Sequence, residues 1–450
     1  MSSYQTWAGT VGTSLYSGGP VTMIYGYLLA IVGSLAGAAS LAELVSAFPT
    51  AEGQISWAEE LAPPSCASFV RYYTAWATTL GWTFIGCSAA FVFANALTGV
   101  AMFTHSDYVP ERWHTSLMLW AVVLFALFVN IYGFRILGLL NTAMGFLASY
   151  VFAEFINETG WSSDGVAFFI GLVGSAFSTI GFDAVAHMSE EMAEPETQAP
   201  KAMIASVLMC LPTALPFIIT LLFVIENTDY LATLPYPFVE IIDKAVRNKG
   251  GAVVLTFLPI ATTSILATAG RVLWSFSVEG GVPCSKWLSH LNTSLNVPVN
   301  ALCVVATIQC LLALIYIGNT ALFGSILTLT VAFLNISYMI PCFLMLVRGR
   351  PQRLLPHAPF RLGPLLGPLC NIFAIVYQLV VSVMLFLPTT LPTAPSTMNW
   401  ACVIFAGAHC ILGVYWFFGG KVATSRVHEQ HELARQETGA KQHGRAVDPK

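Results

Sequence analysis

Charged side chains are scarce in this chain. Asp, Glu, Lys and Arg make up 9% of its 450 residues, whereas hydrophobic residues make up 56% and the mean hydropathy is +0.71. A soluble domain carries about 25% charged residues, and a chain this apolar cannot cover a water-facing surface with polar groups. The composition therefore predicts an all-α polytopic membrane protein whose outer surface contacts the lipid bilayer. The net charge of −4 indicates no nucleic-acid partner.

The motifs of soluble enzymes and metal sites are also missing. The sequence contains no GxSxG, HExxH or P-loop pattern, and its 10 cysteines include no CxxC pair. His428 and His431 lie three residues apart in a polar tail, which we interpret as a solvated segment rather than a metal site. We therefore predict no enzymatic activity, no cofactor and no bound metal.

Long apolar runs divide the chain into membrane crossings. A spanning helix needs about 20 mostly apolar residues. Two weaker stretches, 5–17 and 136–152, bring the predicted total to about twelve crossings. The strong runs lie near 20–48, 72–103, 116–134, 164–188, 203–225, 251–276, 299–317, 321–347, 368–388 and 398–419.

The placement of basic residues supports this count. With twelve crossings and a cytoplasmic N-terminus, most of the 19 Lys and Arg residues fall on the cytoplasmic side, as the positive-inside rule expects. Without the crossing at 136–152, everything after it would invert and the basic loop 348–361 would move outside. We therefore predict that 136–152 crosses. Residues 1–420 then form a transmembrane transporter domain, and 421–450 form a disordered cytoplasmic tail.

One apolar run is interrupted about midway. In GSAFSTIGFDAVAHMSEE (174–191), Ser178, Thr179 and Gly181 interrupt the helix, and Asp183 and His187 follow four residues apart on one face. Unwound carbonyls can hold an ammonium group, and the N-terminus of the next half-helix can hold a carboxylate. This pattern favours a substrate site. The alternative is a kinked helix whose Asp–His pair only packs the bundle.

Three further stretches are candidates for function. The N-terminal SSYQTWAGTVGTSLYSGGP is rich in Gly, Ser and Thr, and is either functional or a flexible leader. Glu43 falls late in the second crossing, where a structural helix-end charge is favoured over a catalytic role. Arg271 lies in an apolar run, where it could reach the membrane surface or pair with a carboxylate near an inner gate.

These stretches together resemble the amino acid–polyamine–organocation (APC) superfamily. Within it they are most similar to the fungal amino acid/choline transporter family, which includes GABA and choline permeases. The resemblance covers nearly the whole chain, and its motifs are specific for the family but not for a substrate. It is carried by SGGPVTMIYG (17–26), SLAELVSAFPTAEGQISW (40–57), GWSSDGVAFFIGLVGSAFSTIGFDAVAHMSEE (160–191) and ATAGRVLWSFSVEGGVP (267–283).

The resemblance implies a LeuT-like fold with two inverted five-helix repeats and two extra helices. The first and sixth crossings are broken, and substrate binds between them. Family members are usually proton symporters or facilitators in the plasma membrane or the vacuolar membrane. Carried over by position, the substrate-binding residues are Ser3, Thr6 and Trp7 of the first break and Ser178, Thr179, Ile180, Gly181 and Phe182 of the sixth. Asp183, His187, Glu43 and Arg271 are the candidates for coupling or gating.

The sequence departs from the family pattern in two places. The first crossing is N-terminally truncated, because the chain begins about at the break, and the fifth crossing is shortened near 146–150. No Lys or Arg lies between Arg135 and Lys201 to replace a coupling ion. Two hypotheses stay open: a permease for an amino acid or small amine such as GABA or choline, with protons as a possible partner, and a transport-inactive, truncated relative that senses or binds or has no activity.

Overall fold

The computed structural model is almost entirely helical across the residues that it describes, which are 3–105, 107–132, 155–225, 236–246, 249–250, 262–292, 295, 297–348, 358–395 and 397–420. This part of the chain holds no named strand and only two isolated β-bridges. The helical elements are α1 (Ser3–Tyr16), α2 (Gly19–Val21), the π-helical turn η1 (Thr22–Gly26), α3 (Tyr27–Ala47), α4 (Gln54–Leu61), α5 (Ala67–Thr104), α6 (Arg112–Tyr132), α7 (Asp164–Gly171), α8 (Val173–Thr179), the 3₁₀ helix η2 (Phe182–Glu191), α9 (Pro195–Val224), α11 (Phe238–Val246), α13 (Thr262–Val278), α14 (Ser285–Leu288), α15 (Val299–Gly318), α16 (Leu322–Val347), α17 (Gly363–Leu385), α18 (Ala401–Tyr415) and η3 (Trp416–Gly420).

The predicted membrane-spanning character is confirmed. Within the described ranges, nine helices or helix pairs are long and apolar enough to cross a bilayer. They match nine of the ten strong apolar runs. The tenth run, predicted over 251–276, contributes the shorter apolar helix Ile265–Val278. The weak stretch 136–152 and the predicted tail 421–450 lie outside the described residues.

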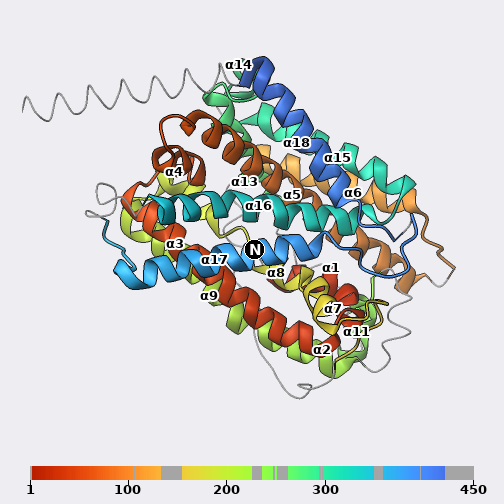
Figure 1. Cartoon of the computed structure of the whole chain (residues 1–450). Coiled ribbons are helices and arrows are strands. Elements are labelled where there is room, and N and C mark those ends of the chain that lie inside the picture. The colour runs from red at the N-terminus through yellow and green to blue at the C-terminus, as the bar shows by residue number, and fades with distance from the viewer. Residues whose placement is uncertain are drawn as a thin grey trace, which may run out of the picture.

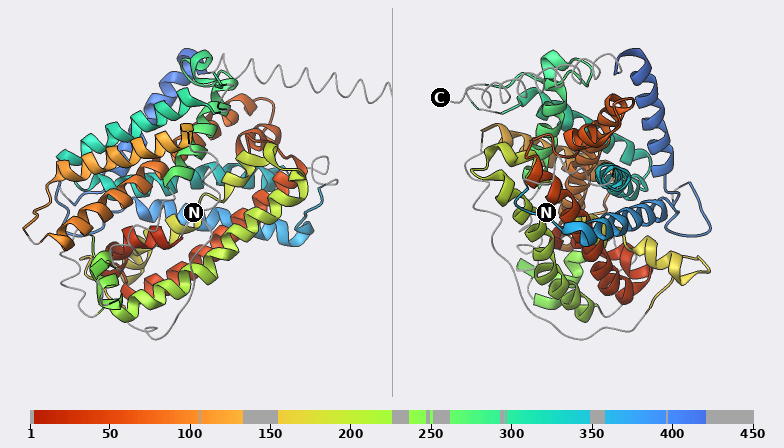
Figure 2. Two further views of the ribbon diagram at one scale, coloured as in Figure 1. Left: turned by 180° about the vertical axis from the view of Figure 1, so that it is seen from behind. Right: turned by 60° about the vertical axis from the view of Figure 1, so that its left-hand side comes forward.

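The helices pack as two related sets. Helices early in the chain lie against helices later in the chain in the same order: α1 packs against α8, α3 against α9, α5 against α13, and α6 against α15. Figures 1 and 2 show the α3–α9 pair running side by side along one flank of the bundle. A pseudo-two-fold axis between two five-helix repeats would produce this pairing, and an odd number of crossings inverts the second repeat. The packing therefore agrees with the inverted-repeat fold that the family resemblance implies.

The first helix is held in the bundle by close backbone contact. Ser14 Oγ donates to the carbonyl of Gly171 at 2.9 Å, and Trp7 and Val11 are completely buried. A Cβ atom added to Gly171 would lie 2.0 Å from the backbone oxygen of Ser17. Glycine at 171 therefore allows the backbone directly after α1 to approach α7 more closely than any other residue would permit.

Replacing Gly171 with alanine is expected to destabilise the fold. Because the clashing atom belongs to the backbone, whole segments must shift, and overpacking of this kind costs about 1–3 kcal/mol. The melting temperature of the detergent-purified protein should fall, as measured by thermal unfolding. Gly165→Ala on the same helix is the matched control, since its Cβ would meet only Ser163 Oγ at 3.6 Å. Equal melting temperatures for the two variants would contradict the close approach.

Candidate functional site

The sixth crossing is divided into two half-helices. Helix α8 ends at Thr179, Ile180 is extended, and Gly181 adopts φ 82° and ψ 15° before η2 begins at Phe182. This left-handed conformation is available to glycine without the steric cost that a Cβ atom brings. The backbone is thus interrupted within the stretch 178–183, where the sequence predicts a break.

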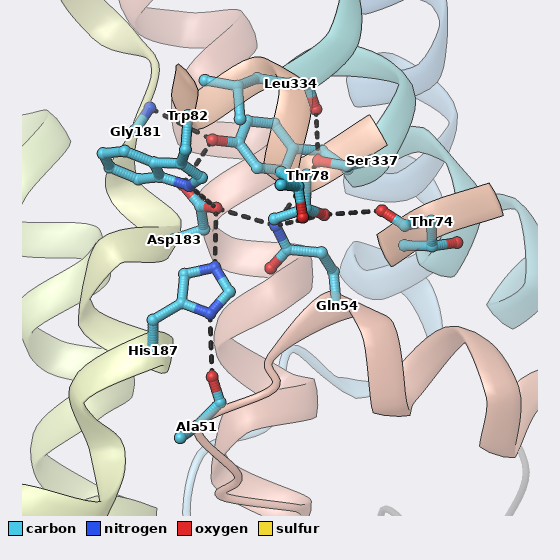
Figure 3. Close-up of polar contacts among 12 residues, drawn as sticks. Ala51, Gln54, Thr74, Thr78, Trp82, Gly181, Asp183, His187, Leu334 and Ser337 are labelled. Atoms are coloured by element: carbon cyan, nitrogen blue, oxygen red, sulfur yellow. Dashed lines mark hydrogen bonds and ion pairs between the residues drawn. The ribbon is translucent and has the colours of Figure 1, made fainter. Parts of the chain in front are cut away.

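A buried carboxylate lies directly after the break. Asp183 is completely buried, and its Oδ2 accepts hydrogen bonds from Gln54 Nε2 at 2.8 Å and Trp82 Nε1 at 2.9 Å. Its Oδ1 accepts from the Tyr338 hydroxyl at 2.5 Å, and that hydroxyl in turn accepts from the Gly181 amide at 3.2 Å. Figure 3 shows the Asp183 carboxylate between the side chains of Trp82, Gln54 and His187. Donors from α4, α5 and α16 therefore converge on the half-helix that follows the break.

His187 lies between Asp183 and the turn before α4. Its Nε2 lies 3.3 Å from Asp183 Oδ2, and its Nδ1 lies 2.9 Å from the carbonyl oxygen of Ala51. A carbonyl only accepts, so Nδ1 carries a hydrogen. The carboxylate oxygen and a ring nitrogen without hydrogen are both acceptors, so the contact at Nε2 needs a further hydrogen, on Nε2 or on the carboxyl group. A proton placed there would be shared by Asp183 and His187.

The other residues predicted for the sixth break are buried around it. Ser178 Oγ donates to the Ser175 carbonyl at 2.8 Å, and Thr179 Oγ1 accepts from Ser34 Oγ at 2.9 Å. The ring of Phe182 packs on Tyr338 with centroids 4.7 Å apart. Ile180 is 6% exposed. The hydroxyl groups of Ser178 and Thr179 are therefore hydrogen-bonded within the protein. The irregular feature at the break is the backbone at 180–181.

The residues predicted for the first break are arranged differently. Residues 3–7 form the first turns of α1, so the expected unwound stretch does not fall there. No proline or glycine interrupts these five residues, and α1 packs continuously along α8. Trp7 is fully buried against Tyr27, and its Nε1 has no hydrogen-bond partner among the described residues. The side chains of Ser3 and Thr6 lie outside the described part of the chain.

Trp7 lies on the α8 side of the break. The ring centroids of Trp7 and Tyr27 are 5.9 Å apart. The Tyr27 hydroxyl donates to the Cys210 carbonyl at 2.8 Å. The Cys210 thiol in turn lies 4.0 Å from the carbonyl oxygen of Ser178. Two residues, Tyr27 and Cys210, therefore connect Trp7 to the end of α8.

The two remaining predicted residues lie away from Asp183. Glu43 is buried at the end of α3, where its Oε1 accepts the backbone N–H of Leu362 at 2.6 Å, at the start of α17. A carboxylate at this position stabilises the helix N-terminus, which matches the structural interpretation. Arg271 is half-buried on α13. Arg71, which directly precedes the predicted run 72–103, lies inside α5 and is surrounded by carboxylates.

A cavity of about 410 Å³ opens at the end of the bundle that we predict to be extracellular. It reaches Gly9, two residues after Trp7. Its other lining residues come mainly from α1, α5 and the start of α6, and include Thr13, Tyr16, Asn95, Thr98, Arg112 and Tyr236. The space therefore leads from one surface toward the first helix of the candidate site.

The sequence interpretation missed the residues that surround Asp183. Gln54 lies inside the motif quoted for the family resemblance, whereas Trp82 and Tyr338 lie in long apolar runs. A polar group in an apolar run is a signal for function, but it does not reveal which helices face one another.

Comparison with known proteins places these features in a family. Residues 2–408 match the sequence profile of the family described as amino acid permease. The chain is 31% identical to the choline transporter of Saccharomyces cerevisiae, over 92% of this chain and 79% of that protein. It is 26% identical to an amino-acid permease of Arabidopsis thaliana, over 92% and 87%. A manganese transporter from Eremococcus coleocola aligns with a TM-score of 0.41 and 11% identity, over 95% and 92%.

Proposed function

This chain belongs to the amino acid permease family, and from that premise we propose that it carries a small amine or amino acid across a membrane through the broken helix α8–η2. The observation that supports this route is the interruption at Ile180–Gly181 beside the buried Asp183. Broken helices in transporters provide free backbone groups for charged ligands in the middle of the bilayer. The plasma membrane is the proposed location, with the vacuolar membrane as the alternative.

The geometry favours a substrate that carries a positive charge. Carbonyl groups at the end of α8 face the break, and the negative Asp183 follows it within three residues. Both features attract an ammonium or quaternary ammonium group. The unpaired Trp7 Nε1 would then donate to a hydroxyl or carboxylate oxygen of the same substrate. Choline, GABA and amino acids all combine these two chemical groups.

The Asp183–His187 pair is proposed to link transport to a proton. The pair lies in the half-helix after the break, and its ring nitrogen also holds the Ala51 carbonyl of the turn before α4. Loss of the proton shared by Asp183 and His187 would weaken the contact between the two side chains within η2, and with it the position of His187 against the Ala51 carbonyl. A movement of η2 would then accompany proton release, which is what a proton symporter requires.

Uptake measurements test the proposed function directly. Purified protein in liposomes is expected to accumulate at least one labelled compound among choline, GABA and the common amino acids above the level of empty liposomes. An inward proton gradient should increase the initial rate, because the Asp183–His187 pair would load its proton from the outer side.

The controls separate transport from binding and leakage. Excess unlabelled substrate should compete with uptake, and a protonophore should remove the effect of the gradient. If no compound in the panel enters faster than into empty liposomes, the permease proposal for this chain is wrong. Uptake that ignores the gradient would remove the proton from the proposal.

A further inference from the structure

Four charged side chains meet at the end of the bundle that we predict to be cytoplasmic. Arg71 of α5 is ion-paired with Glu52 at 2.9 Å and, more closely, with Glu59 and Glu279. Glu52 lies in the turn before α4, Glu59 lies in α4, and Glu279 directly follows α13. We name these four residues the Arg71 cluster. It joins three separate elements through one guanidinium group.

The Arg71 cluster brings three carboxylates to one guanidinium. Arg71 is 1% exposed, and the side chains of Glu59 and Glu279 are 5% and 10% exposed. Carboxylates this close to one another in a largely buried space repel, which favours protonation of one member.

The shared position of Glu52 and Glu279 shows where that proton would lie. Both carboxylates contact the same Nη2 atom of Arg71, which brings the two carboxyl groups close together. Two ionised carboxylates have only acceptors and repel each other unless a hydrogen lies between them. In support, burial raises the pKa of the Glu279 carboxyl well above its ordinary value. Glu52 adds to the rise and Arg71 opposes it.

The Arg71 cluster is connected to the candidate substrate site. Ala51, whose carbonyl contacts His187 Nδ1, is the residue directly before Glu52. A displacement of this turn would therefore affect the cluster and the Asp183–His187 pair together. The other charged side chains on the elements packed around the cluster are Glu60 of α4, Asp183, His187 and Glu190 of η2, Arg271 of α13, Lys286 of α14 and, directly after α16, Arg348, whose Nη1 donates to the Ala62 carbonyl.

We propose that Glu52 and Glu279 share one proton, and that this proton keeps the predicted cytoplasmic end closed by holding α13 against α4 and α5. When the proton leaves through the partly exposed Glu52 to cytoplasmic water, all three carboxylates around the one guanidinium are ionised. Their repulsion separates the end of α13 from the turn before α4. The closed state is therefore favoured at low pH and is lost as the pH rises. This inference depends on the proposed function for its purpose, but its test does not require transport.

The test compares Glu279→Gln and Glu52→Gln with the unchanged protein. Glutamine keeps a hydrogen-bond donor toward the partner carboxyl group but cannot release a proton. We expect the infrared C=O band of one protonated carboxylic acid in the unchanged protein at neutral pH, and its loss in both variants. Glu190→Gln, an exposed residue at the same end of the bundle, should keep the band.

Thermal unfolding gives an independent result. Between pH 6 and pH 9 the melting temperature of the unchanged protein should fall by about 2 °C more than that of Glu279→Gln, since a pKa difference of one unit changes a protonation equilibrium tenfold. If Glu279→Gln unfolds too readily to be measured, Glu52→Gln takes its place in the comparison. If both variants keep the acid band and the pH slope of the unchanged protein, the shared proton is disproved, whatever the outcome of the uptake experiments.

Discussion

Replacing Asp183 with asparagine is expected to lower the initial rate of uptake by about 100-fold and to remove its dependence on pH. Asparagine can still accept the hydrogen bonds of Gln54 and Trp82 through its amide oxygen, so the fold should survive. The negative charge is lost, however, and with it the proton that Asp183 and His187 would share. Hydrogen bonds to a charged group contribute about 1.5–3 kcal/mol, and each 1.4 kcal/mol is a factor of ten.

The matched control for this variant is Glu158→Gln. Glu158 is an exposed carboxylate in the loop that leads into α7, and removing its charge leaves the neighbourhood of the break unchanged. Uptake in liposomes at several pH values, with equal protein content and melting temperature checked for each variant, measures the effect. Asp183→Asn uptake that matches that of Glu158→Gln at every pH would remove Asp183 from the transport mechanism.

Replacing Gly181 with valine is expected to reduce uptake by about 100-fold as well, for a conformational reason. At φ 82° a β-branched residue is strongly strained, at a cost of about 1–3 kcal/mol or more. A Cβ atom alone would fit, since its nearest neighbours are Trp82 at 3.5 Å and Ile85 at 3.7 Å. Backbone strain is therefore the main effect of the substitution, and crowding comes only from the two methyl groups of valine. Both effects should shift the break out of its present geometry.

Alanine substitutions at two glycines of positive φ separate the effect of backbone strain in general from the effect of strain at the break. Gly181→Ala should show a smaller loss than Gly181→Val, because it adds strain without the extra methyl groups. Gly363→Ala is the control, since Gly363 has a similar φ of 78° and no atom within 4 Å of an added Cβ, but lies at the start of α17. Uptake by Gly181→Val at the rate of Gly363→Ala would show that the break is not part of the route.

The sequence predicted the features that depend on local composition. Nine apolar runs became helices of spanning length because each run is long enough on its own to bury its backbone groups in lipid. The interruption at 178–183 was also readable, since it combines glycine with polar residues inside an apolar run. Boundaries were less accurate: α5 begins at Ala67 rather than at 72, which places Arg71 inside the helix.

The sequence could not show which side chains meet at Asp183. Gln54, Trp82 and Tyr338 are separated from it by 129, 101 and 155 residues. Whether such a residue faces a partner helix or lipid depends on how each helix is rotated about its own axis, and packing in the assembled bundle sets that rotation. Helix α5 illustrates the difficulty, because it is apolar and buried on most of its surface. The partners of Arg71 were hidden for the same reason.

The contact between Ser14 and Gly171 has a consequence for how the protein is made. The two residues are 157 positions apart, so α1 leaves the ribosome long before α7 and α8 exist to receive it. Helix α1 also carries buried polar groups such as Thr10 and Ser14. The final docking of α1 against α7 and α8 is therefore a late step of assembly, which can be completed only after those two helices have been made.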